Sequence, residues 1–241
     1  MKRTLILWGH GVQSGHGRGA FAGLVTAVRR AAPDLEVIDA FVDDQKPSMS
    51  ELMGQTRGPR ILVPFVLAHD RSVTVDISQL ARREPSVVVT APLGPDWALA
   101  EVGVQRMIEA GGRSDDTIVL AADVATDDRT VADIGKAARL LSAVWGGRVH
   151  VGTLGGPDTQ LADAIDIARA YGRRVVISTY LMAPGSVHDD IARAGADVVT
   201  APMLKRGRPE HRIVELVLDR VRTCDAGRPA GVDPGPGFAH R

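Results

Sequence analysis

The sequence has 241 residues, and 29 Lys and Arg balance 29 Asp and Glu, so the formal net charge is zero. The charges are dispersed, without a basic patch interleaved with aromatic residues, which argues against a nucleic-acid partner. No apolar run approaches the roughly 20 residues that span a bilayer, and a single cysteine excludes an intrachain disulfide and a cysteine-ligated iron–sulfur cluster. Residues 1–3 lead directly into a predicted strand rather than a secretory signal, so a cytoplasmic protein is expected.

Predicted strands and helices alternate along the first half of the chain. Short apolar runs rich in β-branched residues predict strands, and amphipathic periodicity predicts helices. Strands are expected at residues 4–8, 36–42, 60–67 and 86–91, and helices at residues 20–31, from the cap residue 48 onward, at 76–83 and up to 108. A glycine pair at 111–112 then breaks the pattern.

The same order of elements returns in the second half. Strands are expected at residues 117–121, 148–152, 173–180 and 197–201, and helices at 129–144, 158–170, 189–194 and 210–222. The segments VVTAPL at 88–93 and VVTAPM at 198–203 occupy the same stage of each half. This correspondence indicates an internal duplication of roughly 110 residues.

The fold class expected is α/β, with two duplicated domains at residues 1–112 and 113–222. Each is predicted to hold a mostly parallel four-stranded sheet flanked by helices, and strand ends are predicted to line a cleft between the domains. Residues 223–241 are rich in Gly and Pro with little to bury, so a disordered tail is predicted. A duplicated chain supplies its own pseudo-dimer, which favours a monomer.

The loop after the first predicted strand, HGVQSGHGRG at 10–19, contains two histidines among glycines. Ligands of open α/β sheets bind at the carboxyl ends of strands, so His10 is placed where chemistry is expected. The alternative is a histidine that only hydrogen-bonds backbone. A dinucleotide GxGxxG motif starting at Gly9 fails at Ser14, and no GxxxxGK[ST] motif follows, so no nucleotide cofactor is expected.

A series of short segments extends along most of the chain: LILWGHG at 5–11, DAF at 39–41, PSM at 47–49, LVP at 62–64, APLGP at 91–95, TYLMAPG at 179–185 and AGAD at 194–197. This ordered combination resembles the two-domain form of the CbiX/SirB family of sirohydrochlorin chelatases. The resemblance implies a lyase of siroheme or cobalamin biosynthesis. Such an enzyme inserts divalent Co, Fe or Ni into a sirohydrochlorin-type tetrapyrrole without a nucleotide.

The resemblance also implies site residues. The family usually has one histidine in the HG motif, which is His10 here, and a second in the loop after the third strand, which falls on Ser72. A serine hydroxyl is a poor metal ligand and a very poor base. His69 lies three residues earlier in the same loop, and because three residues of loop can span about 10 Å, its side chain can reach the same space. In the second half, the counterpart of His10 is Asp123, and His188 lies in the loop that corresponds to that of Ser72.

Two interpretations of these histidines remain open. In the first, His10 and His69 are catalytic and, together with His188, bind the metal ion, because imidazole accepts a proton or binds a borderline metal near neutral pH. In the second, His69 and His188 are solvated loop residues and the site has decayed. The protein would then bind a tetrapyrrole or a metal without turnover, or catalyse another reaction in the same cleft.

The carboxylates of the expected substrate require cationic and polar partners. Arg18 and Arg71 flank the candidate histidines and can pair with carboxylates, although a loop arginine is often only an exposed residue. Ser72 and Ser186 occupy corresponding loops of the two halves. These four residues form the predicted substrate-binding set.

Overall fold

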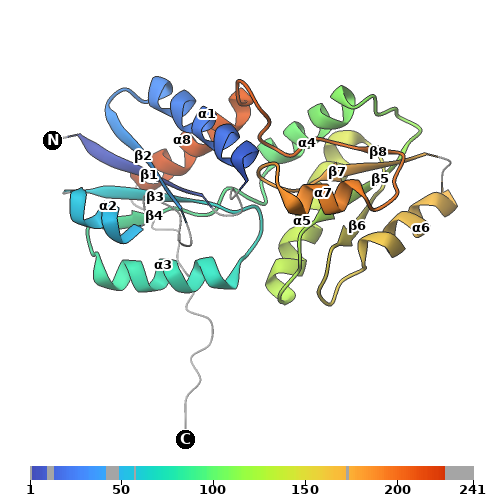
Figure 1. The fold of residues 1–241 in the computed structure, drawn as a ribbon, viewed down its shortest axis with the longest axis horizontal. Helices are drawn as coiled ribbons and strands as arrows, with labels where there is room; N and C mark the ends of the chain where they lie inside the picture. Colours follow the sequence, from blue (N-terminus) through green and yellow to red (C-terminus); the bar gives the residue numbers. More distant parts are fainter. Residues whose placement is uncertain (1, 10–13, 42–48, 57, 172–173, 226–241) are drawn as a thin grey trace, which may run out of the picture.

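The computed structural model describes residues 2–9, 14–41, 49–56, 58–171 and 174–225. Within these residues, strands and helices alternate along the whole chain (Figure 1). The elements are β1 (Arg3–Gly9), α1 (Gly15–Ala31), β2 (Leu35–Phe41), α2 (Met49–Gln55), β3 (Arg60–Phe65), α3 (Arg71–Arg83), β4 (Val87–Val89), α4 (Trp97–Glu109), β5 (Thr117–Ala122), α5 (Asp128–Trp145), β6 (Val149–Thr153), α6 (Leu161–Tyr171), β7 (Val175–Thr179), α7 (Ser186–Ala192), β8 (Val198–Val199) and α8 (His211–Asp225).

The strands form two four-stranded sheets with the same topology. The first has the order β2-β1-β3-β4 and the second has the order β6-β5-β7-β8, and every strand pair in both is parallel. Figure 1 shows the two sheets side by side, with helices on their faces. The predicted α/β class with two four-stranded sheets is therefore confirmed.

One central core joins the two sheets. Strand β1 alternates, so that Leu5 and Leu7 point into a cluster that also contains Ile118 and Leu120 of β5, whereas Ile6 and Trp8 point into a separate cluster under α2 and α3. A parallel strand is buried on both faces, which explains why its sequence is continuously apolar. Because the central cluster draws on both sheets, neither half closes its core alone.

The fourth helix of each half covers the sheet of the other half. Helix α4 packs against α5 and β7, whereas α8 packs against α1 and β3. Figure 1 shows this exchange directly, since α8 lies beside α1 although it comes last in the chain. Gly103 permits the close approach of α4, because a Cβ there would lie 3.2 Å from Leu141 Cδ1 of α5.

Arg106 of α4 anchors that helix to the second half. Its side chain is 2% exposed, its Nε donates to the carbonyl of Pro202 at 3.1 Å, and its Nη2 donates to the carbonyl of Met203 at 2.9 Å. Its Nη1 also forms an ion pair with Glu210, the residue before α8, at 2.8 Å. A planar guanidinium with five donors suits such a set of acceptors.

Arg220 of α8 makes the corresponding contacts in the first half. Its Nε donates to the carbonyl of Pro92 at 2.9 Å, and its Nη2 donates to the carbonyl of Leu93 at 3.0 Å. The same Nη2 is 2.8 Å from Asp96, the N-cap of α4. The carbonyls that accept from these two arginines therefore belong to VVTAPL and VVTAPM, the segments that indicate the duplication.

Two helices begin earlier than their sequence patterns predict. Helix α1 starts at Gly15 rather than at residue 20, because the Ser14 hydroxyl caps it by accepting from the N–H of Gly17 at 2.8 Å. Helix α3 starts at Arg71 rather than at residue 76, because the Asp70 carboxylate accepts from the N–H of Val73 at 3.1 Å. Each cap satisfies a free amide of a first turn made mostly of glycine or polar residues. The glycine-rich loop and the third-strand loop are both shorter than expected.

The predicted division into domains at residues 1–112 and 113–222 stays a prediction, and the helix exchange means that neither segment contains its whole layer of helices. Helix α8 continues to Asp225, so residues 223–225 of the predicted tail are helical. Residues 226–241 lie outside the described residues.

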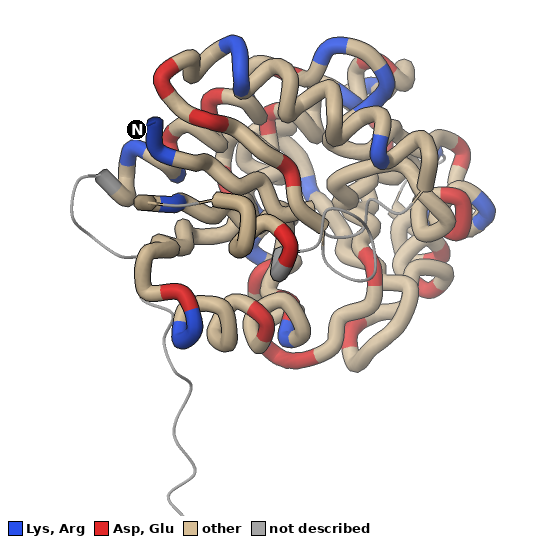
Figure 2. The backbone as a smooth tube through the Cα atoms, turned by 60° about the vertical axis from the view of Figure 1, so that its left-hand side comes forward, with Lys and Arg blue, Asp and Glu red and all other residues tan. Residues whose placement is uncertain are grey.

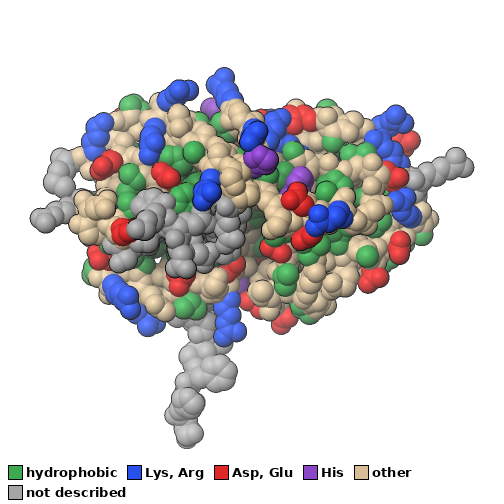
Figure 3. All heavy atoms as spheres, viewed as in Figure 1, with side chains coloured by type: hydrophobic (Ala, Val, Ile, Leu, Met, Phe, Trp, Pro, Cys, Tyr) green, Lys and Arg blue, Asp and Glu red, His purple; other side chains and the backbone are tan. Residues whose placement is uncertain are grey.

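The described surface mixes positive and negative side chains. On the faces drawn in Figure 2 and Figure 3, Lys and Arg alternate with Asp and Glu over both halves. Among the described residues, no helix combines the length and apolar composition that a membrane crossing requires.

Candidate active site

A cleft of about 590 Å³ opens where the carboxyl ends of strands from both sheets meet. Its lining comes from the segments after β3, β5 and β7, from the starts of α5 and α7, and from Ser14 before α1. This is the location that strand order dictates for ligands of parallel sheets. The expected cleft is therefore present.

The walls of the cleft are mainly apolar. The apolar side chains are Phe65, Val66, Leu67, Ala68, Ala122, Val124, Ile134, Leu181, Met182, Ala183 and Val187. The ionisable groups of the described lining are His69, Asp70 and Asp123, with the phenol of Tyr180, and no Lys or Arg belongs to it. Such a surface suits a large flat apolar ligand better than a buried carboxylate.

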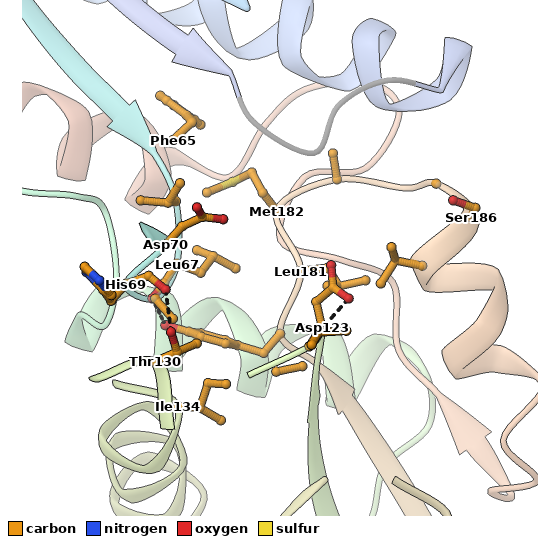
Figure 4. Close-up of a pocket in the computed structure, with 18 of the residues that line it drawn as sticks. Phe65, Leu67, His69, Asp70, Asp123, Thr130, Ile134, Leu181, Met182 and Ser186 are labelled. Atoms are coloured by element: carbon orange, nitrogen blue, oxygen red, sulfur yellow. Dashed lines mark hydrogen bonds between the residues drawn. The ribbon is translucent and has the colours of Figure 1, made fainter. Parts of the chain in front are cut away.

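His69 lies in the loop between β3 and α3 and is held against α5 of the second half. Its N–H donates to Asp133 Oδ2 at 2.8 Å, and its carbonyl accepts from the Thr130 hydroxyl at 2.9 Å. Its ring, 15% exposed, has Nε2 3.6 Å from Asp127 Oδ2 and Nδ1 3.5 Å from the Thr74 hydroxyl. In Figure 4 the ring lies across the cleft from Asp123 and Ser186. These contacts fix the position of the backbone and orient the ring.

The Asp127 carboxylate that faces His69 is stabilised in its charged form. The pKa of Asp127 is lowered, chiefly because the backbone N–H of Thr130 donates to it, with further help from the Thr130 hydroxyl and from the charge of His69. Asp127 is also the N-cap of α5. A cap residue thus connects the start of α5 with the third-strand loop of the first half.

The other predicted residues of that loop point elsewhere. Arg71 and Ser72 form the exposed first turn of α3 and are absent from the cleft lining. The Ser72 hydroxyl donates to Asp70 Oδ1 at 2.6 Å, so it helps to hold the cap of α3. Asp70 itself lines the cleft, and Figure 4 shows its carboxylate on the same side as His69.

In the second half, Asp123 and Ser186 line the cleft, and His188 does not. Asp123 directly follows β5, and Ser186 is the exposed first residue of α7. The Nε2 of His188 lies 3.1 Å from the carbonyl of Thr200, where a ring N–H can donate. The structure therefore brings His69 and Ser186 to one cleft and places His188 on the side of α7 that meets the end of β8.

The segment after β1 also reaches across to the second half. The Ser14 hydroxyl donates to the carbonyl of Pro184 at 2.6 Å while it caps α1. Arg18 lies exposed in the first turn of α1, as does His16. His10 lies outside the described residues, so its predicted role remains a prediction.

Tyr180 lines the cleft and connects the two halves. Its hydroxyl donates to the carbonyl of Leu67 at 2.8 Å, and burial raises the pKa of its phenol far above the usual range. Gly94 packs directly beneath this contact, because a Cβ there would lie 2.2 Å from the Leu67 carbonyl oxygen. Tyr180 fixes the loop after β3 relative to β7, across the two halves.

The predicted site residues do not include Asp127, Thr130, Asp133 or Tyr180. Asp127, three residues before Thr130, is typical of a helix N-cap and could have located the start of α5. This local pattern does not indicate that both residues also contact His69 in another loop. Tyr180 carried a stronger signal, since it is one of two tyrosines and is the last residue of a predicted strand. Among the described residues, no three His, Cys, Asp or Glu side chains form a group that could hold a metal ion. The metal role of His10, His69 and His188 thus stays a prediction.

Residues 4–110 match the model of the CbiX family. The whole chain is similar to SirB from Bacillus subtilis with Fe³⁺, with a TM-score of 0.74 and 18% identity over 92% of this chain and 95% of that chain. The sirohydrochlorin chelatase SirB from Bacillus subtilis subspecies spizizenii in complex with cobalt gives a TM-score of 0.69 and 18% identity over 92% and 94% of the two chains.

A third solved structure extends this likeness beyond SirB. CbiX, described as the terminal enzyme for biosynthesis of siroheme in denitrifying bacteria, gives a TM-score of 0.61 and 13% identity over 92% of this chain and 99% of that chain. No curated protein sequence matches the chain significantly. At these identities the structures establish a common fold that extends over both halves of the chain, and the resemblance to the CbiX/SirB family is confirmed.

Proposed function

We propose that this protein inserts a divalent metal ion into a sirohydrochlorin-type tetrapyrrole bound in the cleft. The observation that carries the proposal is the cleft of about 590 Å³, lined from both halves of a chain that has the SirB fold and a CbiX domain. Small-molecule sites typically measure roughly 300–1,000 Å³. The metal ion is a substrate of this reaction, together with the tetrapyrrole.

The lining of the cleft supports a macrocycle whose flat face is buried and whose rim stays in water. Leu67, Leu181 and Met182 offer apolar surface to the ring. The peripheral carboxylates would be costly to bury, so they remain at the opening of the cleft. Arg18 and Arg71, exposed in the first turns of α1 and α3, are assigned to these carboxylates.

Metal insertion requires two pyrrole N–H protons to leave as the metal ion binds the ring nitrogens. His10, which directly follows β1 in the sequence, is assigned as a proton acceptor or metal ligand. His69 is assigned a supporting role from the loop after β3, where Asp127 Oδ2 lies 3.6 Å from its Nε2. His188 belongs to the predicted metal-binding set, but its Nε2 lies 3.1 Å from the Thr200 carbonyl and the residue is absent from the described lining of the cleft. Cobalt and iron, present in the SirB structures, are two of the metals expected here with nickel.

Absorbance spectroscopy tests the proposal. Purified protein is mixed with sirohydrochlorin and Co²⁺, Fe²⁺ or Ni²⁺, and the spectral conversion is compared with a reaction without protein. Conversion is expected to exceed that control and to be lost in His10→Ala. The matched control is His211→Ala, because His211 is 82% exposed on α8 and outside the cleft lining.

The other outcomes have distinct meanings. A shifted macrocycle spectrum without metal-dependent conversion would identify a binding protein instead of a chelatase. Conversion that is unchanged in His10→Ala would contradict the assignment of that histidine but leave the reaction in place. No spectral change with any of the three metals would contradict the proposed function.

A further inference from the structure

Asp123 occupies the position in the second half that His10 occupies in the first. It is the residue directly after β5, the first strand of the second sheet, as residue 10 directly follows β1, the first strand of the first sheet. The correspondence holds further along both segments, because Ser14 and Asp127, each the fifth residue after its strand, cap α1 and α5. The alignment of Asp123 with His10 therefore rests on structure as well as on sequence.

The carboxylate of Asp123 lies in the cleft with little to engage it. Its only hydrogen bond among the described residues is a local one, in which Oδ1 accepts from the N–H of Val124 at 2.8 Å. The residue is exposed and its neighbours in the lining, Ala122, Val124 and Leu181, are apolar. In Figure 4 its side chain rises from the end of β5 into the cleft. Within the described part of the chain, no other group contacts this carboxylate through a hydrogen bond, so its Oδ2 is available to a bound ligand.

The other ionisable groups of the cleft are committed to structural contacts. Asp70 caps α3 through Val73 and holds the Ser72 hydroxyl. The His69 ring faces Asp127 across 3.6 Å. Within the described parts of the chain, Asp123 forms no ion pair and caps no helix, which distinguishes it from both.

We infer that Asp123 is a catalytic residue of the second half that accepts a pyrrole N–H proton during metal insertion. The inference rests on the proposed function. As the N–H bond breaks, its electron pair stays on the ring nitrogen and forms the bond to the divalent metal ion, and the proton passes to a carboxylate oxygen of Asp123 and then to water. Metal ion and free macrocycle thus give metallated macrocycle and two protons, with no change of oxidation state.

Each half contributes one acceptor in this arrangement. A carboxylate accepts hydrogen bonds and has no proton to donate when ionised, so it can orient toward an N–H group before the metal arrives. The apolar surroundings strengthen such an interaction relative to water. The histidine of the first half corresponds to an acid in the second half, and the two residues then have different roles. A carboxylate is a harder ligand than imidazole and competes less well for a borderline metal ion, so Asp123 is suited to accept the proton rather than to bind the metal.

The test compares Asp123→Asn and Asp123→Ala with Asp128→Asn in the full-length protein. Asp128 is the matched control, because it is an exposed acid in the same segment that is absent from the cleft lining. Macrocycle binding is measured by sirohydrochlorin fluorescence without metal, and insertion is measured in single-turnover reactions with Co²⁺. Removal of a general base typically costs roughly 10²–10⁴-fold in rate.

The expected result is an insertion rate reduced about 100-fold or more in Asp123→Asn and Asp123→Ala, with the affinity for sirohydrochlorin unchanged or higher because a negative charge is removed. Asp123→Glu should recover part of the rate, and Asp128→Asn should match the unmodified protein. An insertion rate in Asp123→Asn equal to that of the unmodified protein would overturn the inference alone. If the unmodified protein inserts no metal, both the inference and the proposed function are overturned.

Discussion

Arg106 and Arg220 lie on the last helices of the two halves, and each binds two consecutive backbone carbonyls of the other half. Each also pairs with the carboxylate that directly precedes the other helix. The caps behave in the same way: Ser14 of α1 reaches the loop before α7, and Asp127 of α5 reaches the loop before α3. The interface between the halves is therefore built from contacts that occur twice.

The groups that face the cleft do not occur twice. The first half has a histidine after its first strand, and the second half has Asp123 there. The loop after β3 places His69 against α5, whereas the loop after β7 inserts Tyr180 beneath Leu67. The duplication thus retains its scaffold contacts in both halves and differs where a ligand would bind. The two halves serve as one site with unequal walls, as expected when a single substrate spans a pseudo-symmetric interface.

Substitution of the two reciprocal arginines, Arg106 and Arg220, should have the largest effect on the contacts that the halves share. Arg106→Ala leaves two buried carbonyls and Glu210 without their partner, so we expect the free energy of unfolding to fall by about 3–4 kcal/mol. Arg220 is 19% exposed against 2% for Arg106, so water can replace part of its contacts. Arg220→Ala should therefore cost about half as much. Urea unfolding of both variants measures the difference.

A matched change elsewhere separates this effect from loss of any surface arginine. Among the described residues, the Arg193 side chain pairs only with Asp190, one turn away, and it is largely exposed. Arg193→Ala should therefore change the free energy of unfolding by less than about 0.5 kcal/mol. Equal losses in Arg106→Ala and Arg220→Ala would contradict the inference that burial makes the two contacts unequal.

Tyr180 offers a test of the contact that the first half lacks. Tyr180→Phe keeps the ring but leaves the buried carbonyl of Leu67 without its donor, so a loss of about 1–2 kcal/mol is expected. Tyr171, the other tyrosine, is 65% exposed, and Tyr171→Phe is the control, with no measurable loss expected. Chemical denaturation at neutral pH gives both values.

The same tyrosine predicts a dependence on alkaline pH. Burial raises the pKa of Tyr180 in the folded protein, whereas in the unfolded chain it ionises near its ordinary value of 10.0. Above that pH the unfolded state loses a proton that the folded state keeps, so the free energy of unfolding should fall as pH rises past about 10. Tyr180→Phe should lack this part of the decline. Identical slopes for the two proteins between pH 9 and 11 would contradict the assignment.

The two caps allow a smaller comparison between the halves. Ser14→Ala removes the acceptor for the N–H of Gly17 and the donor to Pro184, so a loss of about 1 kcal/mol is expected. Because the Pro184 contact links the two halves beside the cleft, hydrogen exchange should also rise in the loop before α7. Ser14→Thr is the conservative control and should retain most of the stability. A loss without faster exchange in that loop would limit Ser14 to a capping role.

Sequence reasoning reached the sheets because each strand is buried on both faces and so reads as an unbroken apolar run, as in residues 5–8. It reached the duplication through repeated short segments. The predicted starts of α1 and α3 lie five residues too late, because most residues of their first turns are glycine or polar and each start depends on one cap. The contacts of His69 with Asp127, Thr130 and Asp133 lie about 60 residues apart in sequence and follow no local periodicity. The tertiary arrangement alone determines them.

Asp127→Asn gives the smallest expected effect and the sharpest view of the link between α5 and His69. Asparagine caps a helix as well as aspartate, so the variant keeps the cap but removes the charge that faces the ring. The pKa of Asp127 is lowered from the ordinary value of 3.8, so its charge stabilises the folded state above that pH, and the contribution disappears as pH falls through the lower folded value. We expect Asp127→Asn to cost less than about 1 kcal/mol at pH 6 and nothing near pH 2.

Asp128→Asn, the neighbouring acid in the same first turn, is the control that retains the Asp127 carboxylate. It should leave the difference between pH 6 and pH 2 as it is in the unmodified protein. If Asp127→Asn behaves like Asp128→Asn at both values of pH, the carboxylate acts only as a cap. The link between the halves at His69 would then depend on Thr130 and Asp133, whose contacts to the His69 backbone involve no charge on the ring.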